Sequence, residues 1–260
     1  MTEIELQYLI KLHVDNERQG PGSTSHTLQA LALSGFDINQ SLQIADIGAG
    51  TGSATLPLLS HTASHVTAVD FLEPFLEKLS NRVQDYYPTA IEQGRLNLVN
   101  ESMDSLTFDA NQFDLIWSEG AIYNIGFKSG LHNWIKFLKP KGKMVVSEIT
   151  WLTHTRPNAI ETYWLDNYPE INTADHKIKE IFEAGFTLKG YFELPRECWV
   201  NNYYLPIERS LKKLESMVSD TSSESYLELM KLKSREQEEF ALYQNYHEYY
   251  SYGVYIMQKA

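Results

Sequence analysis

The stretch Asp46-Ile-Gly-Ala-Gly-Thr-Gly52 decides the fold of this 260-residue chain. It continues Ile44-Ala45, a short apolar run typical of a buried parallel strand, and it leads into an expected helix over about residues 52–63. Alternating glycines let a ligand approach the backbone closely, and the helix N-terminus behind them offers free N–H groups to an anionic group. This turn predicts a ligand-binding corner at the start of an α/β sheet.

Apolar and amphipathic segments alternate after this turn. Further strands are expected at residues 65–69, 96–99, 113–117 and 143–147, with helices at about 74–86, 128–138 and 174–185. This alternation predicts a Rossmann-like, doubly wound and mostly parallel sheet with right-handed crossovers. Two late apolar runs, at 186–194 and 250–257, bring the expected total to seven strands and predict an antiparallel edge strand.

The chain is expected to form one domain with four consecutive parts. An N-terminal helical cap (1–40) holds helices at about 2–14 and 25–34, and a core (41–195) follows it. A charged helical insertion (196–249), expected to be a solvated cap or a dimer surface, precedes the last edge strand of the core (250–260).

Composition excludes several classes of function. The formal net charge of −12 argues against binding a nucleic-acid backbone, which needs a basic face. A single cysteine, Cys198, leaves no partner for an intramolecular disulfide and excludes a cysteine-based metal cluster. The chain start lacks the form of a signal peptide, and no apolar run approaches the roughly 18 residues that span a bilayer. We therefore expect a cytoplasmic enzyme without a metal, acting on a small molecule and possibly homodimeric.

Asp70 makes the expected ligand more specific. It ends the second strand, where an acidic side chain binds ribose hydroxyls, so the glycine loop and Asp70 together predict a nucleoside cofactor. The dinucleotide fingerprint G-x-G-x-x-G would need a glycine at position 53, which is Ser53. The phosphate-binding pattern that ends in Gly-Lys-Ser/Thr is also missing from this loop.

The pattern acid-x-Gly-x-Gly-x-Gly from Asp46 to Gly52 resembles that of class I S-adenosylmethionine (SAM) methyltransferases. In that family the loop holds the methionine part of SAM, the second-strand acid holds the ribose, and the segment after the third strand cradles adenine. Residues 101–108 resemble the adenine segment, with Met103 against the adenine face and Ser102 where the family often has an aspartate. The resemblance covers about residues 40–150. It implies SAM as the cofactor, bound by Asp46, Gly48, Ala49, Gly50, Gly52, Asp70, Phe71, Ser102, Met103, Ser118 and Glu119.

A narrower resemblance concerns residues 118–126, the early segment 18–23 and the strand near the chain end. These segments are similar to UbiE-like bacterial methyltransferases, many of which have no assigned substrate. The Asp/Asn-Pro-Pro-Tyr/Phe motif of enzymes that methylate base amino groups is replaced by Ser118-Glu-Gly-Ala. Together with the acidic charge, this predicts a small-molecule acceptor.

Candidate catalytic and substrate residues follow the fourth and fifth strands. Glu119 either orients the substrate, takes a proton, lies near the sulfonium or is merely structural, and Tyr123 and Asn124 follow on the same loop. Trp151 and Trp164 flank the exit of the fifth strand, where they form either a lid over the substrate or part of the core. His154 is the histidine near that exit and is a candidate base.

The absence of a clear catalytic constellation fits methyl transfer. This reaction is an in-line displacement that needs alignment and a dry pocket more than a set of catalytic side chains. A nicotinamide-dependent oxidoreductase on a similar sheet and a non-catalytic SAM-binding protein remain the alternatives.

Overall fold

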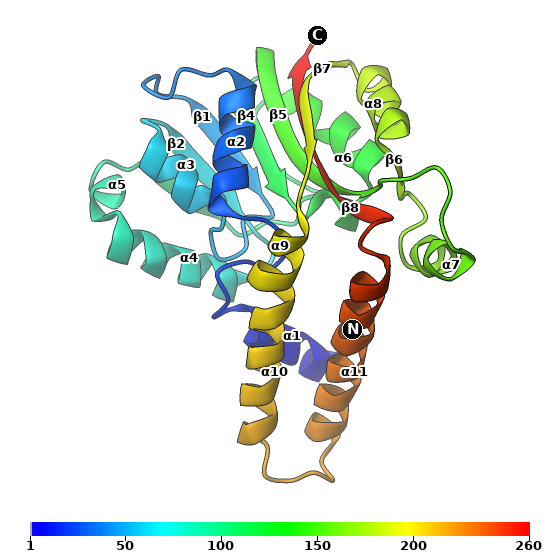
Figure 1. The fold of residues 1–260 in the computed structure, drawn as a ribbon. Coiled ribbons are helices and arrows are strands. Elements are labelled where there is room, and N and C mark those ends of the chain that lie inside the picture. The colour runs from blue at the N-terminus through cyan, green and yellow to red at the C-terminus, as the bar shows by residue number, and fades with distance from the viewer. Residues whose placement is uncertain (1) are drawn as a thin grey trace.

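The alternating segments build one sheet, which the computed structural model of residues 2–260 shows with helices on both faces (Figure 1). The sheet order is β3-β2-β1-β4-β5-β8-β7, with a two-residue strand, β6, paired to β5. The first five strands pair in parallel, as the sequence predicts. They are β1 (Gln43–Ile47), β2 (His65–Val69), β3 (Leu96–Val99), β4 (Phe113–Glu119) and β5 (Leu138–Trp151).

The antiparallel strand is β8 (Tyr250–Lys259), which lies between β5 and β7 (Phe186–Glu193) and pairs with both. The sequence predicts an edge strand at this place, but β7 is the outer strand. β8 lies inside the sheet because most of its side chains are apolar or aromatic on both faces. Its residues are buried from Tyr250 to Met257. A strand of that kind needs cover on both sides of the sheet, whereas much of β7 is exposed or half-buried.

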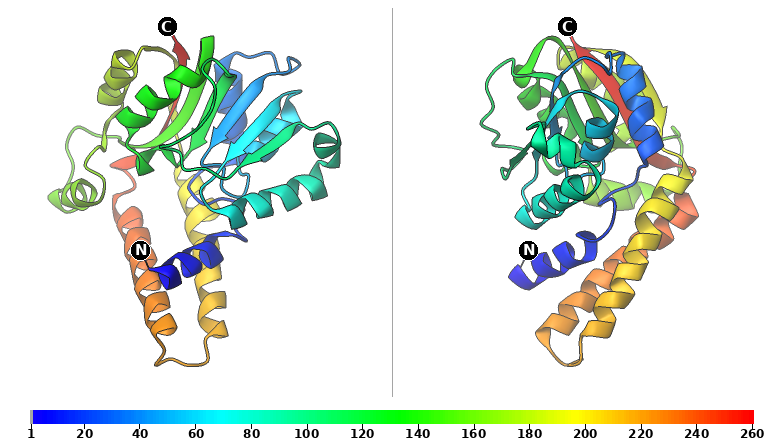
Figure 2. Two further views of the ribbon diagram at one scale, coloured as in Figure 1. Left: turned by 180° about the vertical axis from the view of Figure 1, so that it is seen from behind. Right: turned by 90° about the vertical axis from the view of Figure 1, so that its left-hand side faces the viewer.

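Helices cover the two faces of the sheet separately (Figure 2). Buried side chains of three helices pack with one face, and those of two others pack with the opposite face. The first group is α2 (Thr24–Ser34), α3 (Thr55–His61) and α4 (Glu73–Tyr86), and the second is α6 (Phe127–Trp134) and α8 (Ala174–Glu183).

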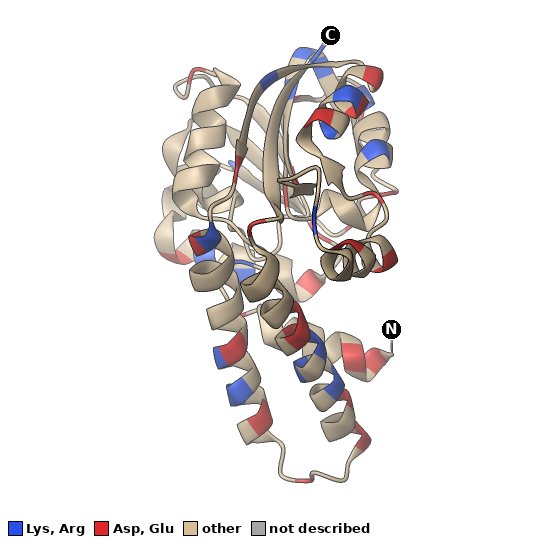
Figure 3. Ribbon diagram, turned by 45° about the vertical axis from the view of Figure 1, so that its right-hand side comes forward, with Lys and Arg blue, Asp and Glu red and all other residues tan. Residues whose placement is uncertain are grey.

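The insertion between β7 and β8 is a helical hairpin that extends away from the carboxyl ends of the parallel strands (Figure 1). Lys, Arg, Asp and Glu are frequent along it, whereas the sheet carries few (Figure 3). Its parts are α9 (Arg196–Trp199), a π-helical turn (Val200–Tyr204), α10 (Leu205–Met217) and α11 (Glu224–Tyr246). The structure therefore contains the predicted charged helical segment.

The two helices of the expected N-terminal cap have different partners. Helix α1 (Glu3–His13) lies across the hairpin, where Tyr8 and Leu12 are buried against Leu211 and Leu229 (Figure 2). Helix α2 lies instead on the sheet, against β7 and β8. Met1, the first residue of the expected cap, lies outside the described residues.

Local signals set the ends of the helices. Thr2 forms a capping box with Glu5 at the start of α1, and Gly35 ends α2 in the left-handed conformation. Two short elements and one longer helix have no counterpart in the sequence prediction: α5 (Pro88–Glu92), the 3-10 turn Ile122–Asn124 and α7 (Asn158–Asn167). The 3-10 turn Ile135–Phe137 follows α6 and lies within the helix expected over 128–138. None of the helices that the structure describes is both long and apolar enough to cross a membrane.

Candidate functional site

The glycine loop bends back over the end of β2. The backbone N–H groups of Gly48 and Ala49 both donate to the carbonyl oxygen of Val69, each at 2.9 Å. Gly48 has a φ of +77°, and a Cβ added there would lie 2.4 Å from the Cβ of Ala121. The loop therefore lies in close contact with the segment after β4, and a larger residue than glycine would be strained at this position.

Asp70 lies beside the loop at the carboxyl edge of the sheet. Its Oδ2 accepts a 2.8 Å hydrogen bond from Gly50 N, and its Oδ1 accepts one of 2.9 Å from Leu72 N. Burial raises the pKa of Asp70, while the two backbone donors act in the opposite direction. The next side chain, Phe71, is 67% exposed. An acid and an exposed ring thus flank the position at which open α/β sheets bind ligands.

Asp46 occupies a different environment beneath the loop. The residue is 1% exposed, and its Oδ2 accepts a 2.5 Å hydrogen bond from the Thr55 hydroxyl. Burial raises the pKa of Asp46 to about 7. The hydrogen bond between Thr55 and Asp46 therefore links the end of β1 to the start of α3.

Met103 lies next to the loop, as expected for the adenine segment. Its Cε is 3.4 Å from the position of a Cβ on Gly48, and its carbonyl oxygen accepts a 3.0 Å bond from Trp134 Nε1. Ser102 is half-buried beside it. Ser118 is fully buried, and its hydroxyl donates to the carbonyl of Ile47 at 2.8 Å, so it links β4 to β1.

Both carboxylate oxygens of Glu119 are hydrogen-bonded. Oε2 accepts from Arg18 at 2.8 Å, and Oε1 accepts from the Thr27 hydroxyl at 2.7 Å and from Trp117 Nε1 at 3.0 Å. The side chains of Arg18 and Glu119 are only 7% and 15% exposed. Glu119 thus joins the early glycine-rich turn, α2 and β4 at one point.

Gln19 connects this turn to the glycine loop. Its Oε1 accepts from Thr51 N at 2.9 Å, and its Nε2 donates to the carbonyl of His13 at 3.1 Å. A Cβ on Gly50 would lie 2.3 Å from Gln19 Oε1. Neither Arg18 nor Gln19 is among the site residues predicted from the sequence. The Gly-Pro-Gly turn that follows them is the signal that a structured segment begins there.

A cavity of about 160 Å³ lies beyond Gln19, between the sheet edge and the helical hairpin. Tyr123 and Trp164, two of the predicted substrate residues, line it. Its other lining residues come from seven segments of the chain: Gln19, Gly20, Pro21, Gly120, Ile149, Asn167, Tyr168, Trp199, Tyr203, Glu239 and Tyr252. The cavity therefore adjoins the glycine loop through Gln19.

Besides Glu119, three of the predicted catalytic and substrate residues lie outside this lining. The Asn124 amide donates to the carbonyl of Ala121 at 2.9 Å and stabilises its own turn. Trp151 is buried, with the Arg156 guanidinium 4.2 Å from its ring centre. His154 is exposed on the loop after β5.

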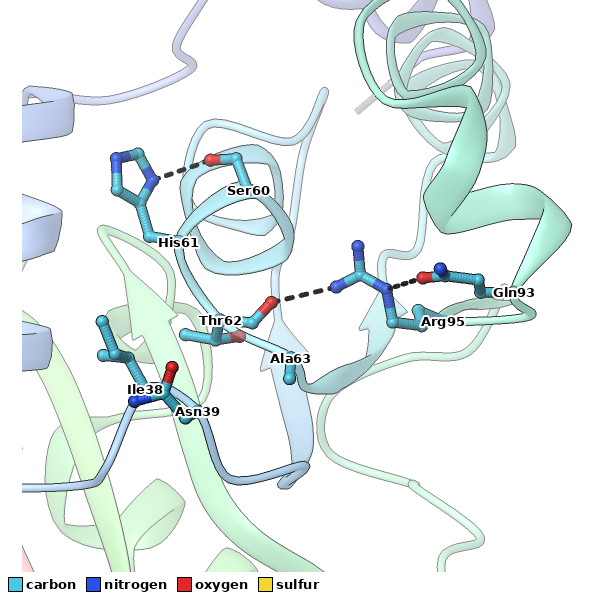
Figure 4. A pocket seen from close by; sticks show the side chains of 8 residues that line it. All are labelled: Ile38, Asn39, Ser60, His61, Thr62, Ala63, Gln93 and Arg95. Atoms are coloured by element: carbon cyan, nitrogen blue, oxygen red, sulfur yellow. Dashed lines mark hydrogen bonds between the residues drawn. The ribbon is translucent and has the colours of Figure 1, made fainter.

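A second, wide-open hollow of about 420 Å³ lies at the opposite edge of the sheet, before β2 and β3 (Figure 4). Arg95 crosses it and donates to the carbonyls of Leu59 and Thr62, both at 3.0 Å, which satisfies the end of α3. Arg95 in this hollow therefore stabilises the fold. Across residues 2–260, no cluster of three or more His, Cys, Asp or Glu side chains has the arrangement of a metal site.

Comparison with known proteins agrees with this geometry. A family model described as "Methyltransferase domain" matches residues 44–142, which contain the glycine loop, Asp70, Met103 and Glu119. The chain is 26% identical over 121 residues to a phosphoethanolamine N-methyltransferase of Plasmodium falciparum (isolate 3D7), covering 45% of this chain and 42% of that protein. It is 28% identical over 127 residues to a glycine/sarcosine/dimethylglycine N-methyltransferase of Actinopolyspora halophila, covering 48% and 22%. The matches therefore span less than half of the length of each relative.

The fold is that of a solved SAM-dependent methyltransferase from Geobacter sulfurreducens, in complex with S-adenosyl-L-homocysteine. The TM-score is 0.81, with 98% of each chain covered and 12% sequence identity. This likeness extends to the N-terminal helices and the hairpin, which lie outside the matched residues 44–142.

Proposed function

We propose that this protein is a SAM-dependent methyltransferase of the UbiE-like group that transfers a methyl group to a small molecule. The observation that carries the proposal is the position of Gln19 between the two halves of the site. Gln19 lines the aromatic cavity, and its Oε1 accepts a 2.9 Å hydrogen bond from Thr51 N in the glycine loop. One half of the site fits a nucleoside cofactor and the other half fits an acceptor. The methyltransferase domain match and the two N-methyltransferase relatives support this division.

The residues around the loop fit the cofactor chemically. Gly48 and Gly50 keep the loop in its tight course, since an added Cβ would collide with Ala121 at the first position and with Gln19 at the second. Asp70 has remaining lone pairs for ribose hydroxyls, because a carboxylate offers about four acceptor positions and its backbone donors Gly50, Phe71 and Leu72 do not fill them all. Phe71 and Met103 offer apolar surface for adenine. Residues 48–52 with Ser102 and Glu119 complete the proposed cofactor site, and Asp46 and Ser118 support it from beneath.

The chain contributes alignment and exclusion of water rather than a catalytic triad. When bound, SAM supplies a methyl group that is already activated by its sulfonium. Tyr123 and Trp164 are proposed to hold the acceptor in the cavity. Glu119 is proposed as a positioning residue, because Arg18, Thr27 and Trp117 already occupy its oxygens.

Ligand-induced stabilisation tests the cofactor. SAM and S-adenosylhomocysteine are expected to raise the melting temperature of the full chain, whereas NADH is not. Asp70→Ala and Gly50→Val should each remove the SAM effect while the far-UV circular dichroism stays that of the wild type. Asp109→Ala, which removes an exposed aspartate after β3, is the matched control. Unchanged SAM affinity in a folded Asp70→Ala protein would contradict the assignment, and a rise with NADH alone would favour an oxidoreductase.

Turnover tests the activity separately. Incubation of the protein with SAM and a metabolite extract should release S-adenosylhomocysteine, and the release should fall in Tyr123→Ala. Binding of SAM without product from any extract would favour a non-catalytic SAM-binding protein.

A further inference from the structure

Aromatic rings form a large part of the cavity wall. Six of the thirteen lining residues are aromatic: Tyr123, Trp164, Tyr168, Trp199, Tyr203 and Tyr252. The rings stand at steep angles to one another. Tyr123 meets Tyr168 edge to face, with ring centres 6.1 Å apart, and Trp199 is inclined by 52° to Tyr252 at 4.9 Å. Several aromatic rings thus line one small space, and an aromatic face attracts an organic cation that lies over it.

One carboxylate, that of Glu239 on α11, completes this wall. Its Oε1 accepts a 3.0 Å hydrogen bond from the Tyr204 hydroxyl, and no salt bridge to Glu239 is found within residues 2–260. No Lys, Arg or His is present among the described residues that line the cavity. One turn earlier on the same helix, Glu236 has a buried Oε2 without a hydrogen-bond partner, while its Oε1 lies 3.9 Å from Arg235 Nε and burial raises its pKa to about 7.

The Glu239 carboxylate in the cavity wall favours a cationic acceptor over an anionic or a neutral apolar one. An anionic acceptor would meet Glu239 without a cation to receive it, because the lining of the described chain holds none. A neutral apolar acceptor would displace water from the carboxylate and leave its charge uncompensated. An ammonium group both neutralises Glu239 and lies against the ring faces.

The volume limits the size of this group. About 160 Å³ is close to the roughly 150 Å³ of a cavity that holds one benzene molecule, so about six non-hydrogen atoms fit. Such a space admits a small ammonium head and excludes a peptide or nucleotide base with its backbone.

We infer that the methyl acceptor is a small amine, bound as its ammonium between the aromatic rings and Glu239. This inference rests on the proposed function. Glu239 takes one proton from the ammonium, which leaves a neutral amine with a lone pair. That lone pair forms the new N–C bond while the S–C bond breaks and its electron pair stays on sulfur. The product is an ammonium with one more methyl group, and the proton on Glu239 passes to water.

Cation binding by the full chain tests the inference without turnover. Calorimetry at constant ionic strength would compare choline with its uncharged analogue 3,3-dimethyl-1-butanol, each with and without S-adenosylhomocysteine. We expect choline to bind at least about tenfold more tightly than the alcohol. Equal affinity for the two compounds, or no choline binding in either condition, would overturn the inference.

Variants on α11 locate the effect. Glu239→Gln keeps an acceptor for Tyr204 and should weaken choline binding about tenfold, with the affinity for S-adenosylhomocysteine unchanged within about twofold. Glu238→Gln, the exposed neighbour on the same helix, is the matched control and should change neither affinity. Tyr123→Leu, at a ring that is 41% exposed, provides a second variant that should also weaken choline binding. Wild-type choline affinity in both Glu239→Gln and Tyr123→Leu would contradict the inference.

The two proposals fail in distinguishable ways. If S-adenosylhomocysteine does not bind while choline binds through Glu239, the methyltransferase proposal fails and the cation site stands. If S-adenosylhomocysteine binds while choline and the alcohol bind equally, the amine inference fails alone.

Discussion

Removing Arg18 is expected to destabilise the protein strongly, although this residue belongs to a loop. Its guanidinium donates to Glu119 at 2.8 Å and to the Thr27 hydroxyl at 3.2 Å. Because the side chains of Arg18 and Glu119 are only 7% and 15% exposed, water compensates little for a missing partner. Arg18→Ala would leave the carboxylate nearly buried beside α2 without its cation.

The magnitude follows from the geometry of the pair. At an effective dielectric constant of about 20, opposite charges about 4 Å apart attract by about 4 kcal/mol. Breaking a buried pair by removing one partner costs about 3–5 kcal/mol. We therefore expect Arg18→Ala to lower the free energy of unfolding by about 3–5 kcal/mol, and we expect about 2–4 kcal/mol of coupling between Arg18 and Glu119.

A double-mutant cycle measures this coupling. Urea unfolding, followed by tryptophan fluorescence, would compare the wild type with Arg18→Ala, Glu119→Gln and the double variant. Lys78 and Asp15 provide the matched control, because their 2.9 Å pair has side chains that are 33% and 57% exposed. Its coupling should be about 0–1 kcal/mol. Equal coupling in the two cycles would refute the reasoning and would make a solvated, reactive Glu119 the better description.

Three further outcomes follow from single features of the structure. Gly48→Ala should lower the free energy of unfolding by about 1–3 kcal/mol, because φ is +77° and the new Cβ would lie 2.4 Å from that of Ala121. Calorimetry should also show weaker S-adenosylhomocysteine binding, and wild-type values for both quantities would count against the loop geometry. Burial raises the pKa of the Asp46 carboxyl from its ordinary value of 3.8 to about 7, so the folded state holds the proton more tightly. Its contribution to stability therefore declines as pH rises from about 4 to about 7, and amounts to about 2.5 kcal/mol between pH 5 and 8. Urea titrations at both pH values should show that decline in the wild type and lack it in Asp46→Asn; parallel behaviour of the two proteins would disprove the assignment. Lys177→Met should cost about 3–5 kcal/mol at pH 8, since it leaves the buried Glu148 without its 3.1 Å partner. Adding Glu148→Gln should recover part of that loss, and no recovery would show that the ion pair is not the cause.

The proposed cofactor half of the site was accessible to sequence reasoning because its residues are close together in the chain. The glycine loop, the strand before it and the helix after it are consecutive, and Asp70 follows the very next strand. Thr2 and Gly35 likewise set helix ends through neighbours within a few residues. In these cases the residues that form the sequence motif are also the residues that contact one another in the structure.

The acceptor half depends on contacts between distant segments. Glu239 belongs to a polar helix whose charged residues all look alike in the sequence, and only its packing near Tyr203 separates it from Glu238. The aromatic density around residues 151–204 is visible in the sequence. It does not reveal that Trp164 faces the cavity while Trp151 is buried in the core. The role of Arg18 is hidden for the same reason, because its partner Glu119 lies 101 residues away.

The place of β8 in the sheet has a consequence for biosynthesis. In the described chain β7 joins the sheet only through β8, and β8 begins more than fifty residues after β7 ends. During synthesis β7 therefore has no strand to pair with, and the edge of β5 stays unpaired, until residues 250–259 have left the ribosome. Helix α1 waits as well, because its partners α10 and α11 emerge some two hundred residues later. The wall of the aromatic cavity that Tyr252 contributes can therefore form only after the segment 250–259 has left the ribosome.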